Sequence, residues 1–280
     1  ITDFCIHMLT PNLEEIYVID VGYEVKDFSF SNDGLLLVYS NSDGLVFLVD
    51  VMDGKEVQTF LGQREYVTCL DFSPDDSFLV SSGSDGIIWW SIETGEKSDH
   101  WELDNNGFTA FAFSPDEMVL AASQSGIGCI YLFDIPSGQV VDVIEETCGF
   151  KVWATGMTFS SDGTDLIHNT DGRIWKVNIQ NEDPILFLED EYSKENCCVT
   201  SVFSDDFQLV ALGGRNGHFE VWNLETEKLL FSPEIPSRSK TSVAFSPDNL
   251  YVVSGNLDGV LRLWELSAGE LLKSIDGFTY

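Results

Sequence analysis

The sequence is poor in basic residues and contains no long apolar run. Its 14 lysine and arginine residues stand against 47 aspartate and glutamate residues, which gives a formal net charge of −33 at pH 7. Because binding to phosphates requires stripes of lysine and arginine, this composition argues against a nucleic-acid partner. No apolar run approaches the ~20 residues of a membrane-spanning helix, and no signal peptide is visible. The sequence therefore predicts neither a nucleic-acid partner nor a membrane partner.

Cysteine and histidine do not occur in the patterns of a metal centre. The six cysteines form no Cys-x-x-Cys pair, and none of the four histidines lies near a cysteine pair. We therefore expect no metal and no organic cofactor. We also expect free thiols in a reducing, intracellular compartment, either cytoplasmic or nuclear. The cysteines are Cys5, Cys69, Cys129, Cys148, Cys197 and Cys198, and the histidines are His7, His100, His168 and His218.

The chain does contain a repeating unit, which is clearest near its C-terminal end. Four short apolar runs there alternate with turn residues, and this pattern predicts a four-stranded antiparallel meander of roughly 40 residues, the period of a propeller blade. Asp258-Gly259 predicts a type I′ hairpin between the second and third strands. The predicted strands are Ser242–Phe245, Leu250–Ser254, Val260–Leu266 and Glu270–Ile275.

Three landmarks of this unit recur in register along almost the whole chain. They are a Phe-Ser pair that ends the first strand, an Asp-Gly or related pair in the hairpin, and the end of the third strand, which is Trp264-Glu265 in the last copy. An aspartate is expected in the turn after each first strand, at Asp33, Asp75, Asp116, Asp162, Asp205 and Asp248. The Phe-Ser pairs are Phe30-Ser31, Phe72-Ser73, Phe113-Ser114, Phe159-Ser160, Phe203-Ser204 and Phe245-Ser246.

These landmarks resemble the WD-repeat family over roughly residues 20–277. The family's Phe-Ser-Pro-Asp element is complete at Phe72–Asp75, Phe113–Asp116 and Phe245–Asp248. The resemblance implies an all-β fold, a β-propeller of four-stranded antiparallel blades. The repeats are also similar in style to arrays of large fungal and bacterial multidomain proteins, including those behind NACHT-type nucleotide-binding domains.

We predict one propeller domain over residues 1–280, with six complete blades and a partial seventh. Residues 1–21 are expected to form the third and fourth strands of the partial blade. Since the chain starts at Ile1 and both ends fall within a blade, we expect an upstream domain of the same polypeptide and either a longer array or an incomplete seventh blade. The full repeats are expected at approximately 22–62, 63–103, 104–146, 147–190, 191–235 and 236–277.

The repeats lack the Gly-His pair of the family, for which Gly62-Gln63 is the nearest equivalent. In the family this histidine joins a buried hydrogen-bond network with the turn aspartate, a strand serine and the tryptophan. We therefore do not expect that network in any blade. Runs that are apolar on both strand faces, such as Leu35–Val38 and Leu209–Leu212, instead predict blades packed between neighbouring blades.

Insertions are predicted where a fourth strand leads to the next first strand, and the longest are Glu145–Trp153 and Glu189–Cys198. The resemblance places these connections on one face, near the central channel. They contain aromatic and basic residues, which are typical anchors of protein interfaces, although Trp153 could instead plug the channel. The acidic surface favours a protein or peptide with a basic segment. The predicted partner-binding residues are Arg64, Tyr66, Trp153, Tyr192 and Arg238.

No catalytic motif occurs, so we predict no catalytic, cofactor-binding or metal-binding residue and no enzyme. The predicted function is a non-catalytic scaffold for protein–protein interaction, or a ligand-sensing module, within a larger protein. The alternative is a propeller-fold hydrolase with a metal in its channel. A purely structural array that spaces other domains is a third possibility.

Overall fold

The computed structural model describes residues 5–11, 13–61, 67–102, 107–126, 128–144, 156–170, 173–180, 184–189, 200–204, 206–214, 217–233, 235, 241–256 and 258–277. Within 184–189 it describes the side chains of Ile185 and Leu186 only. Every regular element in these residues is a β-strand, and they contain no helix of the length and apolarity needed to span a membrane. The strands form six four-stranded antiparallel sheets and one two-stranded sheet, which confirms the predicted all-β propeller fold.

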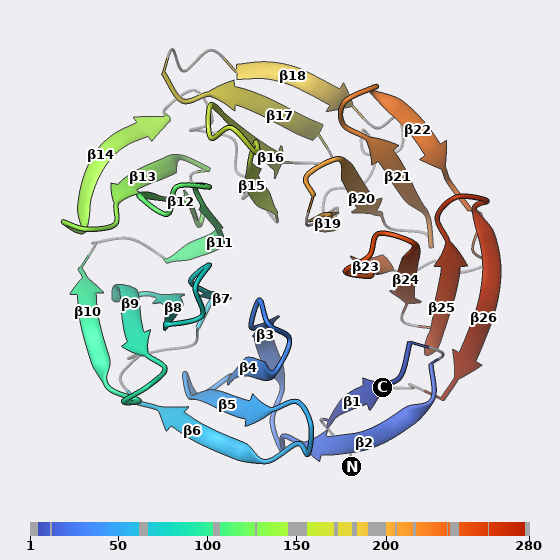
Figure 1. The fold of residues 1–280 in the computed structure, drawn as a ribbon, viewed down its shortest axis with the longest axis horizontal. Helices are drawn as coiled ribbons and strands as arrows, with labels where there is room; N and C mark the ends of the chain where they lie inside the picture. The colour runs from blue at the N-terminus through green and yellow to red at the C-terminus, as the bar shows by residue number, and fades with distance from the viewer. Residues whose placement is uncertain are drawn as a thin grey trace. The chain divides into compact units, whose positions relative to one another are not determined.

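Residues 1–153 form one compact unit with the two-stranded sheet and three blades (Figure 1). The two-stranded sheet pairs β1 (Cys5–Leu9) with β2 (Glu15–Asp20). The first blade contains β3 (Val25–Phe30), β4 (Leu36–Asn41), β5 (Val46–Asp50) and β6 (Glu56–Phe60); the second contains β7 (Cys69–Phe72), β8 (Phe78–Gly83), β9 (Gly86–Ser91) and β10 (Lys97–Trp101); the third contains β11 (Phe108–Phe113), β12 (Val119–Gln124), β13 (Ile130–Asp134) and β14 (Gln139–Ile144).

Residues 154–280 form a second compact unit with three further blades. The fourth blade contains β15 (Met157–Phe159), β16 (Asp165–Thr170), β17 (Arg173–Asn178) and β18 (Pro184–Glu189); the fifth contains β19 (Thr200–Phe203), β20 (Leu209–Gly213), β21 (Phe219–Asn223) and β22 (Lys228–Phe231); the sixth contains β23 (Thr241–Phe245), β24 (Tyr251–Asn256), β25 (Val260–Glu265) and β26 (Glu270–Asp276).

Each blade is a meander in which consecutive strands pair. The pairing of the third strand with the fourth shifts register in every blade, for example between Leu263 and Trp264 on β25. A β-bulge at this point increases the local twist of the sheet. The recurrence of this irregularity shows that the six blades repeat in backbone detail as well as in sequence.

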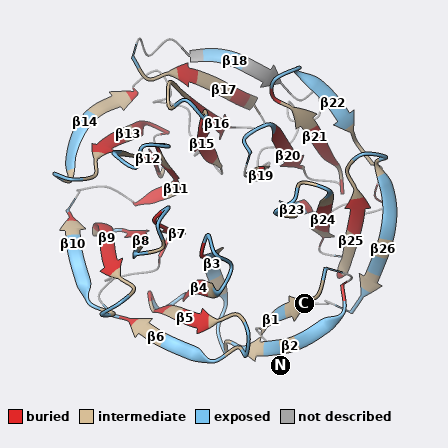
Figure 2. Cartoon of the chain, in the orientation of Figure 1, coloured by how far each residue is buried: buried red, intermediate tan, exposed pale blue. Residues whose placement is uncertain are grey.

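Apolar side chains fill the space between neighbouring blades of the same unit. Val38 and Leu48 of the first blade cluster with Leu79 and Trp90 of the second. In Figure 2 the third strand β9 is buried, whereas the fourth strand β10 is mostly exposed. Each fully buried Leu, Val or Ile side chain contributes about 1.5–3 kcal/mol. The predicted packing of blades against blades is confirmed.

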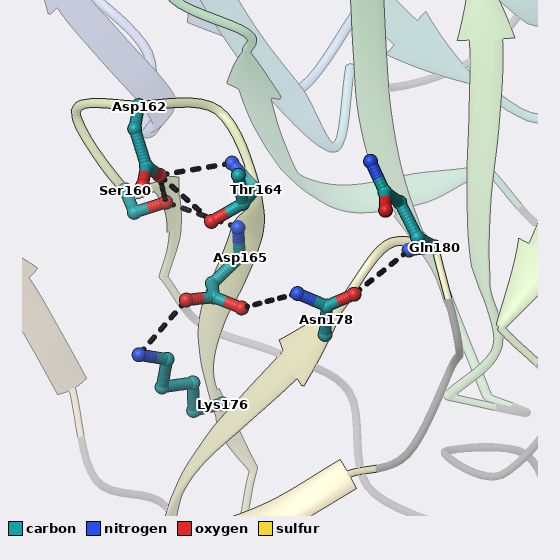
Figure 3. A network of polar contacts seen from close by, with 7 residues as sticks. All are labelled: Ser160, Asp162, Thr164, Asp165, Lys176, Asn178 and Gln180. Atoms are coloured by element: carbon teal, nitrogen blue, oxygen red, sulfur yellow. Dashed lines mark hydrogen bonds and ion pairs between the residues drawn. The ribbon is translucent and has the colours of Figure 1, made fainter.

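The turn after each first strand has the same polar construction in all six blades. In the fourth blade, Ser160 Oγ donates to Asp162 Oδ1 at 2.7 Å and accepts from the Asp165 amide at 3.0 Å (Figure 3). The hydrogen bonds from the Ser160 hydroxyl, and from the amide and hydroxyl of Thr164, lower the pKa of Asp162 to about 2. Equivalent serine–aspartate bonds occur at Ser31–Asp33, Ser73–Asp75, Ser114–Asp116, Ser204–Asp206 and Ser246–Asp248.

In the fifth blade the aspartate that bonds the turn serine is Asp206, whereas Asp205 lies outside the described residues. The predicted type I′ hairpin at Asp258-Gly259 is wrong, because Gly259 is left-handed (φ 75°) and Asp258 is not. The hairpin of the first blade has the same form, with a left-handed Gly44 (φ 77°) and an Asp43 that is not left-handed. Asn41 Oδ1 accepts from the Asp43 and Leu45 amides, both at 3.0 Å, and this bonding stabilises a longer turn that ends on a left-handed glycine.

The first strand of the first blade differs from its counterpart in the second. Phe28 and Phe30 of β3 are 59% and 45% exposed, whereas the equivalent Leu70 and Phe72 of β7 are 4% and 3% exposed. Leu70 and Phe72 pack against the preceding blade. Before β3, the described residues provide only the two-stranded β1–β2 sheet, and its Tyr17 hydroxyl donates to the Val51 carbonyl. This sheet leaves the two phenylalanines uncovered.

Candidate functional site

The five residues predicted to bind a partner lie outside the described residues. The strand bounds nevertheless show which connections contain them. Arg64 and Tyr66 fall between β6 and β7, and Trp153 falls between β14 and β15. Tyr192 falls between β18 and β19, and Arg238 between β22 and β23. Each residue thus belongs to a connection that joins a fourth strand to the next first strand.

These connections vary in length, whereas the turns after the first strands do not. The shortest connection joins Asp20 to Val25, and the longest joins Ile144 to Met157. The turn between the first and second strands has the same length in all six blades. Binding and catalytic residues are concentrated in loops that tolerate changes in length while a rigid scaffold holds them in place. The fourth-to-first-strand connections therefore remain candidate binding segments.

A pocket of about 270 Å³ lies between the second and third blades, inside the first compact unit. Its apolar wall contains four aromatic rings, from Phe78, Trp89, Trp101 and Phe113. The turns at Ser73–Asp75 and at Glu117, together with Ser98, Asp99 and Ile135, complete it. The pocket therefore lies at the ends of the first strands β7 and β11, whereas the connections described above precede their starts.

Trp89 is the centre of the aromatic wall. Its ring centroid is 5.1 Å from that of Trp101, and 6.0 Å from those of both Phe78 and Phe113, which meet it edge to face. Trp101 in turn stacks on Phe133 at 5.2 Å. The Trp89 indole is 7% exposed, and its Nε1 has no hydrogen-bond partner. The wall therefore contains a buried donor that the protein leaves unsatisfied.

Strand alternation explains how Trp89 reaches this position. Trp89 and Trp90 are adjacent on β9, so their side chains point to opposite faces of the blade. Trp90 packs toward the first blade, and Trp89 packs toward the third. Gly138 in the third blade allows the Trp101 indole to approach, because a Cβ there would lie 2.3 Å from Trp101 Nε1. The pocket thus depends on two tryptophans of one blade and a glycine of the next.

Three carboxylates line the pocket, and no lysine or arginine does. Asp99 Oδ2 accepts from Trp101 Nε1 at 2.9 Å, which holds this carboxylate beside the indole. Asp75 accepts from the Ser73 hydroxyl, and this hydrogen bond lowers the pKa of Asp75. Within the described part of the chain, none of Asp75, Asp99 and Glu117 has an ion pair. The pocket therefore has uncompensated negative charge next to aromatic faces.

Part of the tryptophan network that was not expected in any blade is present. Trp90 Nε1 donates to Ser81 Oγ at 2.8 Å, and Trp264 Nε1 donates to Ser254 Oγ at 2.9 Å. The prediction was wrong for this half of the network, because the indole–serine bond forms between neighbouring strands without the histidine. In the fifth blade, Trp222 Nε1 donates instead to Glu220 Oε2 at 2.8 Å.

Glu220 also belongs to a serine–histidine–glutamate cluster, which lacks the geometry of a catalytic triad. Glu220 Oε1 lies 3.1 Å from His218 Nε2, and Ser232 Oγ lies 3.4 Å from the same nitrogen. A triad requires the serine and the carboxylate on different nitrogens of the imidazole. Among the described residues, no group of three or more His, Cys, Asp or Glu side chains could hold a metal ion. The hydrolase alternative gains no support from these residues.

Two carboxylates, Asp27 and Asp71, link the first strands of the first and second blades. Asp27 Oδ2 accepts from the Leu70 amide at 2.7 Å, and Asp71 Oδ1 accepts from Ser29 Oγ at 3.1 Å. Desolvation raises the pKa of each carboxyl to about 6. Both side chains hold β3 against β7, so we assign them a structural role.

The cysteines differ from the prediction in one respect. Cys129 is disulfide-bonded, whereas Cys69 is a buried free thiol whose pKa is raised by desolvation. The expectation of free thiols throughout is therefore wrong for Cys129. No spacing pattern among the cysteines predicts this bond.

The aromatic pocket was missed in the sequence. Trp90 matches the repeated third-strand landmark, but Trp89 does not, and an extra tryptophan next to a landmark was the available signal. The contribution of Trp101 and Phe113 could not be read from spacing, because these residues belong to a fourth strand and to the first strand of another blade.

The chain is similar to one family model and to several known proteins. The model of the WD domain, G-beta repeat, matches residues 54–90 and 235–265. Protein tipD of Dictyostelium discoideum is 24% identical over 260 residues, covering 89% of this chain and 41% of that protein. Apoptotic protease-activating factor 1 of Rattus norvegicus is 24% identical over 247 residues, covering 84% of this chain and 19% of that protein. The human angio-associated migratory cell protein is 24% identical over 266 residues, covering 89% of this chain and 60% of that protein. The chain thus spans between 19% and 60% of the length of these relatives.

Proposed function

Because the chain is a WD-repeat β-propeller, we propose that it is a non-catalytic module that binds a protein or peptide, either as a scaffold or as a ligand sensor, within a larger polypeptide. The partner docks on the connections that precede the first strands, where Arg64, Tyr66, Trp153, Tyr192 and Arg238 are the contact residues. The five contact residues are assigned from the sequence, since they lie outside the described residues.

The observation that carries the proposal is the contrast between fixed turns and variable connections. Six serine–aspartate turns of identical length support the blades, while the fourth-to-first-strand connections differ widely in length. Tyrosine, tryptophan and arginine in such segments are the residue types that most often dominate binding energy. A purely structural spacer has no need of such side chains in its most variable segments.

The charge of the chain supports a partner with a basic segment. Because the net charge is −33, the surface attracts cations over the Debye length, which is ~8 Å at physiological salt. Association should therefore be fast at low salt and slower as salt increases.

The test compares recovery of partners from the native host by the wild type and by a Tyr66→Ala/Trp153→Ala variant. If Trp153 is a central anchor, its loss costs about 2 kcal/mol or more of binding free energy, and under about 1 kcal/mol if it only plugs the channel. We expect partners that the wild type recovers to be lost from the double variant.

The matched control is Leu229→Ala/Leu272→Ala, which removes two exposed apolar side chains from the fourth strands β22 and β26. Thermal melting should first show that both variants remain folded. Equal recovery by the wild type and by Tyr66→Ala/Trp153→Ala would refute the proposed face. If partners are lost from the Leu229→Ala/Leu272→Ala variant alone, the interface lies on the fourth strands instead.

An upstream domain of the same polypeptide and an intracellular location are further proposals. The chain covers only part of each relative, which is compatible with additional domains. The disulfide of Cys129 counts against a reducing compartment, since disulfides persist mainly in oxidising ones. Alkylation of the protein directly from cells, followed by mass spectrometry, would measure whether Cys129 is a thiol in its native compartment.

A further inference from the structure

We propose that the pocket between the second and third blades binds the guanidinium group of an arginine side chain in a partner protein. The proposal builds on the protein-binding function, but it concerns a second surface, at the ends of β7 and β11 rather than before their starts. Neither the family comparison nor the predicted contact residues assign this pocket.

The wall of the pocket has a size and an aromatic lining that suit one cationic side chain. A volume of about 270 Å³ is below the range of about 300–1,000 Å³ typical of pockets for drug-sized ligands, so the pocket suits a single side chain. Trp89 and Trp101 provide indole rings 5.1 Å apart and tilted by 51°. Tryptophan is the aromatic residue that attracts cations most strongly when they lie over its ring.

The pocket is negatively charged. Asp75, Asp99 and Glu117 bring three carboxylates to the pocket, and none has an ion pair within the described residues. Asp99 is fixed by the Trp101 indole at 2.9 Å and by the His100 amide at 2.7 Å, so it is already oriented before a ligand arrives. A carboxylate held beside an aromatic face matches a cation that is both flat and charged.

The arrangement of rings and carboxylates favours arginine over other cations. A guanidinium is planar, stacks on aromatic faces and presents several N–H donors along its edge, whereas an ammonium is a compact point charge. Asp99 and Glu117, which come from two different blades, can accept hydrogen bonds from the N–H groups at the edge of the guanidinium, while an indole ring stacks on its plane. The unsatisfied Nε1 of Trp89 is a donor in the same wall, suited to a carbonyl of the partner's backbone.

The experiment titrates the 15N-labelled full chain with a short glycine–serine peptide that contains arginine. Matched peptides contain citrulline, which has the same shape without the charge, or lysine. The chain has seven tryptophans, so the indole N–H signals of Trp89 and Trp101 can be assigned with the Trp89→Phe and Trp101→Phe variants. We expect these two signals to shift with the arginine peptide, and to shift at least about tenfold less at equal concentration with the citrulline peptide.

Variants separate the pocket from the general negative charge. Asp99→Asn keeps an oxygen that can accept from Trp101, and Glu117→Gln keeps the size of a side chain on a left-handed backbone (φ 58°). The matched control is Asp142→Asn/Glu227→Gln. Asp142 occupies the place of Asp99 in the third blade, Glu227 is also left-handed (φ 55°), and neither lines the pocket.

We expect the Asp99→Asn/Glu117→Gln variant to bind the arginine peptide about tenfold more weakly, with the control unchanged within about twofold. Equal weakening of both variants would overturn the proposal, because it would show binding to bulk charge. Equal affinity for the lysine peptide would overturn the assignment to arginine. Unshifted Trp89 and Trp101 signals would eliminate the pocket as a site, while leaving the connections before the first strands as the proposed interface.

Discussion

Ser81 in the second blade and His168 in the fourth occupy the same place on the second strand, but their surroundings differ. Ser81 accepts from the Trp90 indole at 2.8 Å. In the fourth blade the position of Trp90 is taken by Val177, which has no side-chain donor, and neither nitrogen of His168 has a hydrogen-bond partner. Both side chains are buried. Degeneration of the repeat has therefore left a buried polar group unpaired in one blade and paired in another.

The comparison shows why the fold tolerates a loss of repeat residues. Apolar packing between neighbouring sheets and the six serine–aspartate turns are common to the blades, so they maintain the backbone wherever the tryptophan is replaced. The loss of stability is local, because it comes from desolvation of the His168 imidazole. Desolvation lowers the pKa of His168 to about 4.

The largest effect on the free energy of unfolding is expected in the second blade, where the indole–serine hydrogen bond is present. Trp90→Ala removes a large buried ring together with its hydrogen bond to Ser81 Oγ, so it should lower the free energy of unfolding by about 3–5 kcal/mol. Val177→Ala, at the same place in the fourth blade, removes fewer atoms and should cost less. Urea unfolding measures both. A smaller loss for Trp90→Ala than for Val177→Ala would contradict the comparison.

A smaller and pH-dependent effect is expected in the fourth blade. The folded pKa of His168 is about 4, below its unfolded value of 6.5, so folded protein binds fewer protons than unfolded protein in this window. Stability is therefore complete above about pH 6.5 and falls as the pH decreases toward 4. At pH 5 the loss should be about 2 kcal/mol. The His168→Leu variant, which has the residue found at the equivalent Leu212 of the fifth blade, should not show this loss of stability at pH 5.

The control for this prediction is the difference between wild type and His168→Leu at pH 7.5 and pH 5. Asp27 and Asp71 have pKa values raised to about 6, so their contribution is present below pH 3.8 and is lost as the pH rises through 6. Because both proteins contain these carboxyls, their effect cancels in the difference. A difference that does not change with pH would show that the imidazole is not desolvated as described.

The repeated part of the fold could be predicted from the sequence because each landmark has a local physical cause. Phe245 ends a strand, Ser246 and Asp248 bond within the turn that follows, and a glycine ends the hairpin. The turn type failed at Asp43-Gly44, because the choice between hairpins depends on the Asn41 side chain, which bonds two amides beyond it.

The candidate sites could be predicted only in part. Connections of variable length are visible in a sequence once the strands are placed, and the predicted contact residues follow from that placement. The aromatic pocket is not visible, because Trp89 and Phe113 meet across two blades. Its formation also depends on Gly138, whose role is to let the Trp101 ring approach. Such contacts form only when one sheet packs on another, so they cannot be predicted from the spacing of residues along the chain.

The central claim is that binding occurs at defined surfaces rather than over the whole acidic exterior. Hydrogen exchange of the full chain, with and without the arginine peptide and read by mass spectrometry, tests this claim most directly. We predict added protection in β10 and in the turns 73–77 and 114–118, which border the pocket, and unchanged exchange in the equivalent turns 204–208 and 246–250. Protection of equal size in all of these turns would show binding to distributed charge and would contradict the account.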